Sequence, residues 1–115
     1  MNLNQYEENF MNTSETLLKS MRSVNGISLM ENDSEKEAVH LKKLIDSTIG
    51  LIKLCHKILE DESLNLNEYY EGKFIILSSY LQTLFNELRI NGSPKRLAIT
   101  YYLVGLLECL RYDIF

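Results

Sequence analysis

The residues best placed to do chemistry in this chain are Glu37 and His40, which form a Glu-x-x-His pair. On a helix, residues three apart lie on one face, and carboxylate-bridged di-iron bundles use such pairs as ligands. Those proteins need two such pairs and two further inward-facing glutamates. This sequence has one pair, and Lys53 stands three residues before His56, where a second pair would need a carboxylate. We therefore predict no metal site and no cofactor.

The cysteines, Cys55 and Cys109, are the next candidates, as catalytic nucleophiles. A nucleophilic thiol needs a base, such as His40 or His56, within hydrogen-bond reach and surroundings that favour the thiolate. Cys55 falls on the apolar stripe of its predicted helix, and His56 is rotated from it by about 100°. Because cysteine among apolar residues usually behaves as a small buried hydrophobe, we expect both thiols to be buried and inert.

Other chemistry is equally poorly supported. No pair of neighbouring carboxylates lies in an obvious apolar pocket that would raise a pKa for acid–base work. The five glycines are scattered, without the grouping that cradles a phosphate. The net charge of −4 argues against nucleic-acid binding, which needs a clustered basic face. We predict that the protein is not an enzyme, has no catalytic residues and binds no nucleic acid.

The composition, with 45% hydrophobic and 24% charged residues in 115, is that of an ordinary globular chain. A chain of this length buries a core without disulfides. No apolar run reaches the roughly 18 residues that span a bilayer, and the N-terminus lacks the basic and apolar regions of a secretory signal. We expect one cytoplasmic domain over residues 1–115 with no membrane association.

Helix-end signals divide the chain into four segments. Ser34 followed by Glu37 forms a capping box, and Asn67 is a suitable N-cap for the next segment. Asn91-Gly92 then favours a helix end, and Ser93-Pro94 favours an immediate restart. The predicted helices span about residues 3–22, 34–60, 67–90 and 94–112.

The N-terminal quarter leaves two alternatives open. Leu3, Tyr6 and Phe10 have helical spacing, but residues 12–15 also resemble a helix start, so one bent helix or two short ones fit equally. Residues 24–33 contain Asn25-Gly26 and are predicted to form the longest loop.

The apolar pattern predicts how these helices pack. Apolar residues recur at alternating steps of three and four in the second and third segments, which is typical of helices packed at shallow angles. Residues 97–110 are apolar almost all the way round, and Glu108 is their only charged residue. The predicted fold is therefore all-α, an antiparallel four-helix bundle whose hydrophobic C-terminal helix is packed innermost.

The third predicted helix carries a second apolar flank in addition to its main stripe. Large aromatic residues there either close the edges of the core or form an interaction surface, where tyrosine is enriched. Acidic residues near the N-terminus would steer a partner with a basic surface, and the last two apolar residues should be docked on something. The predicted partner-binding residues are Tyr69, Ile76, Tyr80, Glu7, Glu8, Glu15, Ile114 and Phe115.

These features favour a small protein that acts by stoichiometric binding of another protein. In general build it resembles the compact acidic inhibitors, immunity proteins and anti-defence factors of bacterial mobile elements and phages. One alternative is a homodimer that associates through its C-terminal helix. A second alternative is a bundle that holds an apolar small ligand, with His40 or His56 at its mouth.

Overall fold

The computed structural model of the chain describes residues 3–30, 34–91 and 105–110. Within these ranges the chain is helical apart from short turns, and no strand occurs in them, so the all-α prediction is confirmed. Residues 105–110 form a short helical segment. The other elements are η1 (Leu3–Tyr6), α1 (Glu7–Met30), α2 (Ser34–Glu60), η2 (Glu62–Leu64) and α3 (Glu68–Asn91).

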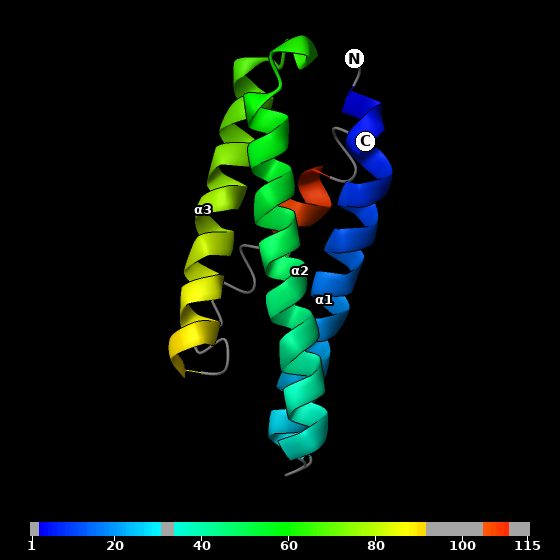
Figure 1. Cartoon of the computed structure of the whole chain (residues 1–115), viewed down its shortest axis with the longest axis vertical. Coiled ribbons are helices and arrows are strands. Elements are labelled where there is room, and N and C mark those ends of the chain that lie inside the picture. The colour runs from blue at the N-terminus through cyan, green and yellow to red at the C-terminus, as the bar shows by residue number, and fades with distance from the viewer. Residues whose placement is uncertain (1–2, 31–33, 92–104, 111–115) are drawn as a thin grey trace.

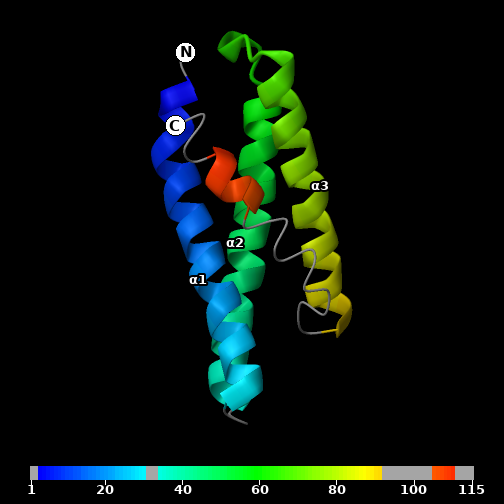
Figure 2. The ribbon, with the colours of Figure 1, turned by 180° about the vertical axis from the view of Figure 1, so that it is seen from behind.

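The three long helices alternate in direction, and α2 is the middle one (Figure 1). It packs along both α1 and α3. Viewed from behind, residues 105–110 lie between α1 and α2 (Figure 2). Leu107 and Leu110 of that segment are buried in the same core as the long helices. The core is therefore shared by segments from both halves of the chain.

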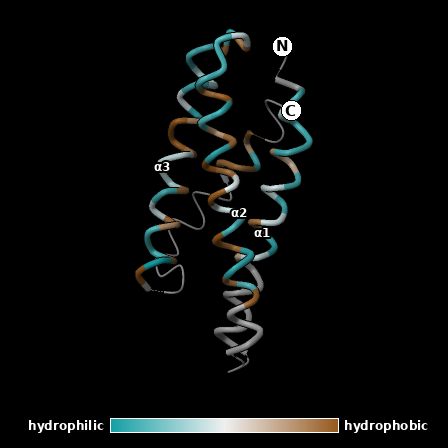
Figure 3. The backbone as a smooth tube through the Cα atoms, in the orientation of Figure 1, coloured by the Kyte–Doolittle hydropathy of each residue, from teal (hydrophilic) through white to brown (hydrophobic). Residues whose placement is uncertain are grey.

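Hydrophobic residues recur along α2 and α3 with hydrophilic residues between them (Figure 3). In α3 the residues Leu77, Leu81, Leu84 and Leu88 are almost completely buried. In α2 the deepest positions are Leu44, Leu51 and Ile58, whereas Leu41, Ile45, Ile52 and Leu59 are half-buried. Buried and half-buried apolar residues together occupy a broad arc of α2, because this helix packs against both α1 and α3.

The sequence-based prediction for the N-terminal third is wrong in one respect. Residues 24–30 are not a loop: α1 runs unbroken from Glu7 to Met30, through Asn25-Gly26. Glycine inside a helix costs only about 1 kcal/mol, which tertiary packing overrides. The alternative of two short helices is also excluded. Residues 12–15 do not begin a new helix, because they lie inside the continuous helix α1. Within it, Thr16 Oγ1 donates to the Asn12 carbonyl at 3.0 Å.

Asp61 joins the beginning of α1 to the connection between α2 and α3. Its carboxylate caps η2 by accepting from the Ser63 backbone N–H at 3.0 Å, and Tyr6 Oη donates to it at 2.6 Å. Hydrogen bonds from Ser63 and then Tyr6 hold the pKa of Asp61 below its usual value. The hydrogen bond to Asp61 also raises the pKa of Tyr6.

Asn67 then caps α3, as expected, through its Oδ1, which accepts from the Tyr70 backbone N–H at 3.0 Å.

Candidate interaction surface

The outer face of α3 exposes more large apolar side chains than its position in a core helix requires. Four residues of this helix have exposed fractions near or above one half: Tyr69 (60%), Ile75 (52%), Ile76 (47%) and Ile90 (72%). Burial of each isoleucine would be favourable by roughly 1.5–3 kcal/mol if a partner covered it completely. Contiguous exposed apolar residues of this kind usually mark a binding site.

A shallow hollow lies in the middle of this face. Its volume is about 350 Å³, and the described residues that line it are Ile75, Ile76, Ser79, Tyr80 and Thr83. Tyr80 is half-buried and packs against the core, so it forms a fixed part of the hollow. The hollow therefore combines two exposed aliphatic side chains with small hydroxyl side chains and has no charge.

The absence of charge extends along the helix. Residues 74–86 include no charged residue over a length of about 20 Å. The exposed side of α2 is different, because it carries charged residues throughout: Lys42, Lys43, Asp46, Lys53 and Lys57. Charged residues are depleted at the centres of protein interfaces, whereas a solvated helix face is rich in them. The two helices thus present surfaces of different kinds.

The first turn of α3 holds its aromatic side chains in place. The rings of Tyr69 and Tyr70 pack edge to face, with centroids 5.4 Å apart and an interplanar angle of 72°. Lys73 places its ammonium group 5.3 Å from the Tyr69 ring centroid, a cation–π contact. Tyr69 is consequently exposed but positioned, which lowers the entropy that it would lose on binding.

The other predicted partner-binding residues do not lie on this face. Glu7 is half-buried and Glu8 is exposed at the beginning of α1, which lies on the other side of α2 from α3 (Figure 1). Glu15, also on α1, forms an ion pair with Lys19, with 3.1 Å between Glu15 Oε1 and Lys19 Nζ. Ile114 and Phe115 lie outside the described residues. The acidic residues of α3 itself are Glu68 and Glu71 in its first turn and Glu87 near its end.

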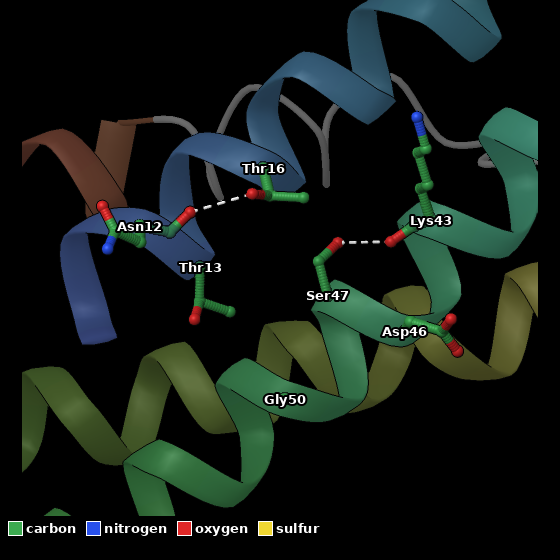
Figure 4. Close-up of a pocket in the computed structure, with 7 residues that line it drawn as sticks. All are labelled: Asn12, Thr13, Thr16, Lys43, Asp46, Ser47 and Gly50. Atoms are coloured by element: carbon green, nitrogen blue, oxygen red, sulfur yellow. Dashed lines mark hydrogen bonds between the residues drawn. The ribbon is translucent and has the colours of Figure 1, made fainter. Parts of the chain in front are cut away.

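A second hollow, of about 400 Å³, lies between α1 and α2 (Figure 4). The residues that line it are Asn12, Thr13, Thr16, Lys43, Asp46, Ser47 and Gly50. The Thr16 and Ser47 hydroxyls donate to carbonyls of their own helices, at 3.0 Å and 2.8 Å. The two helices approach closely at Gly50, where an added Cβ would lie 3.6 Å from Thr13 Cγ2.

These contacts explain the second hollow without a ligand. Short side chains are needed where α1 and α2 approach, and they leave space beside the contact. Lys43 and Asp46 at its border are both exposed to solvent. The hydroxyl protons of Thr16 and Ser47 are already committed to the backbone. Neither hollow resembles the enclosed apolar interior that the small-ligand alternative requires.

The candidate catalytic residues differ in burial and in their contacts. Cys55 is completely buried, and burial raises its pKa to about 12, as expected for an inert thiol. Cys109 is only half-buried, which corrects the expectation for that residue. His56 Nε2 shares a hydrogen bond with Ser78 Oγ at 3.1 Å, which links α2 to α3.

Metal binding has no support in the described residues either. His40 is half-buried in α2, and the side chain of Glu37 lies outside what the structure describes. No group of three or more histidine, cysteine, aspartate or glutamate side chains comes together among the described residues. In the same part of the chain, no helix is long and apolar enough to cross a membrane.

Two exposed apolar residues of α3 were not among the predicted binding residues: Ile75 and Ile90. Periodicity assigned Ile75 to the opposite flank and left Ile90 at a helix end. The uncharged run 74–86 is a signal in the sequence that includes Ile75, but Ile90 lies beyond it.

Comparison with known proteins found no match: no protein-family description, curated protein or solved structure is significantly similar to this chain. The proposal for its function therefore rests on the chemistry of its own residues. The strongest feature of that chemistry is the outer face of α3.

Proposed function

We propose that this protein is a non-enzymatic protein-interaction module that binds through the outer face of α3. One observation carries the proposal: the uncharged stretch 74–86 exposes Ile75 and Ile76 around a hollow of about 350 Å³. A helix that only had to face water would gain from charged residues at those positions, as α2 does. A stoichiometric inhibitor, immunity protein or anti-defence factor belongs to this class, because such a protein acts by occupying a surface.

We further infer that residues 105–110 belong to a fourth helix that completes an antiparallel bundle and is packed innermost. Support comes from Leu107 and Leu110, which are 0% and 1% exposed. A helix that uses these leucines for its own core has fewer apolar residues left for pairing between chains. This weighs against a homodimer formed through the C-terminal helix. Replacing Leu107 with alanine should then destabilise the fold by about 2–5 kcal/mol.

A photocrosslinking experiment in cells tests the interaction surface. The photoreactive residue p-benzoylphenylalanine replaces Ile76 in one variant and Lys53, on the charged face of α2, in a matched control. We expect covalent protein adducts from position 76 and few from position 53, because crosslinking requires a partner within a few ångströms. Equal adducts from the two positions, or none from position 76, would contradict the proposal.

A further inference from the structure

We infer that the partner which the outer face of α3 fits is a second copy of this chain, with the two α3 helices antiparallel and related by a two-fold axis near Tyr80. The inference rests on the proposed function, since it takes the outer face of α3 to be an interaction surface. It goes further by naming the occupant of that face. The argument comes from how charges and side-chain sizes are distributed about Tyr80.

The charged residues at the two ends of α3 are complementary about this position. Glu71 lies nine residues before Tyr80, and Arg89 lies nine residues after it. Lys73 and Glu87 lie seven residues before and after. In an antiparallel pair centred at Tyr80, each charge therefore meets the opposite charge of the other copy. Two independent pairs share one centre.

Helical geometry also puts the members of each pair on the same flank. Glu71 and Arg89 are eighteen residues apart, which is five turns, so they project in the same direction. Lys73 and Glu87 are fourteen residues apart, slightly less than four turns, and share the other flank. An antiparallel arrangement related by a two-fold axis brings equivalent flanks together, which is what both pairs require.

The apolar surface is compatible with the same arrangement. Gly72 lies eight residues before Tyr80, and no atom comes within 4 Å of the position that a Cβ would occupy there. Ile90, the most exposed of the large apolar residues of α3, lies ten residues after it. The large side chain of one copy would therefore lie near the open position of the other, displaced by two residues, or about 3 Å, along the helix. Ser79, beside the axis, is small enough for the helices to approach closely.

Other arrangements lack these pairings. A parallel pair related by a two-fold axis brings opposite flanks together, so Glu71 would lie near Lys73 and Arg89 near Glu87 of the other copy. That arrangement aligns the two helix dipoles in the same direction, which is less favourable than the antiparallel alignment. An unrelated partner could supply the required charges, but α3 already contains an opposite charge for four of its five charged residues, with Glu68 as the exception.

Charge reversal followed by mixing tests the inference on the full chain. Sedimentation equilibrium should show a concentration-dependent dimer for the natural sequence. Glu71→Arg and Arg89→Glu, measured separately, should each weaken that dimer by about tenfold, because each variant creates two like-charge contacts. An equimolar mixture of the two variants should restore association, since the mixed dimer contains only opposite pairs at these positions.

The apolar part of the interface has a matched control. Ile76→Glu should abolish dimerisation, whereas Val39→Glu, which changes a similarly exposed residue of α2, should leave it unchanged. Circular dichroism on both variants shows whether each is folded. Restoration by mixing cannot arise from a misfolded single variant, so the charge experiment stands independently of this one.

Three results would overturn the inference. They are a monomer at all concentrations, a dimer insensitive to Ile76→Glu, and a mixture of the charge variants that associates no better than either alone. The proposed function fails differently. Suppose that the protein is a monomer but position 76 still crosslinks to a different protein. The interaction surface would then be supported, and only the inference that a second copy covers it would be wrong.

Discussion

Two hollows in the described part of the chain are similar in size and differ in chemistry. The hollow between α1 and α2 is the larger, at about 400 Å³, and is bordered by charged residues and hydroxyl groups. The hollow on α3, at about 350 Å³, is lined by isoleucine, tyrosine and small hydroxyl side chains. The first results from the close packing of two helices, whereas nothing in the packing of the core requires the second.

The volume of a hollow is therefore a poor guide to where the proposed interaction surface lies. At the α1–α2 hollow the polar groups are satisfied by their own helices, and the charges already face water. At the α3 hollow the exposed aliphatic groups face water at a free-energy cost that only a partner would remove. Four predictions break or sharpen this comparison.

The largest effect should separate the inner and outer sides of α3. Phe74 is completely buried and packs edge to face with Phe10, with ring centroids 6.0 Å apart. Phe74→Ala should lower the free energy of unfolding by about 3–5 kcal/mol. Ile75→Ala, one residue away on the exposed side, should change it by less than about 0.5 kcal/mol. Chemical denaturation measures both. Similar losses for the two variants would mean that Ile75 is part of the core.

A smaller effect concerns a buried hydroxyl of α1. Ser14 is 0% exposed, and its Oγ has no hydrogen-bond partner among the described residues. Ser14→Ala should raise the free energy of unfolding by about 1 kcal/mol, because it removes an unsatisfied polar group. Ser47→Ala serves as the control. Its hydroxyl bonds to the Lys43 and Leu44 carbonyls, so the gain should be absent. A destabilised Ser14→Ala protein would show that the hydroxyl has a role.

The α1–α2 hollow itself is tested by Gly50. An added Cβ would make an ordinary contact with Thr13, so Gly50→Ala should stabilise α2 by about 0.5–1 kcal/mol through helix propensity. It should leave crosslinking from position 76 unchanged. Thermal melts and the crosslinking assay check the two parts. Loss of crosslinking in the Gly50→Ala protein would mean that binding depends on the α1–α2 hollow, contrary to the proposal.

The smallest effect is a pH dependence at the end of the bundle where Asp61 holds α1 to the α2–α3 connection. The pKa of Asp61 is lowered in the folded protein, so its contribution to stability is present above the usual carboxyl pKa of 3.8 and is lost as the pH falls through the folded value. Melting temperatures should show this loss below about pH 4. In Asp61→Asn the corresponding step should be missing. A step that persists in this variant belongs to another carboxylate.

Much of the fold could be predicted from local signals. The Asn67 cap is decided by neighbouring residues, and α2 and α3 begin at Ser34 and Glu68, close to the predicted starts. The end of α1 could not be predicted in the same way. Asn25-Gly26 is a frequent helix end, but here the helix continues to Met30, because a local preference of about 1 kcal/mol does not by itself fix a helix end.

The candidate surface was predicted in part. Periodicity identified the flank of Tyr69, Ile76 and Tyr80 but assigned its charged rim to the N-terminus. Sequence position alone could not reveal that α2 lies between α1 and α3. It also could not show that Ile75 and Ile90 stay exposed, since an apolar residue on a helix is more often covered by a neighbour.

The sequence by itself determined the all-helical fold, the starts of α2 and α3, and the uncharged character of residues 74–86, because these depend on residues close together in the chain. Only the tertiary structure decided that α2 is the central helix, that Ser14 is buried without a partner among the described residues, and that the uncharged stretch keeps one side in water. Those properties depend on which helix covers which face. Which helix covers which face depends on the packing of many residues that are distant in the sequence, and no short sequence signal reports that packing.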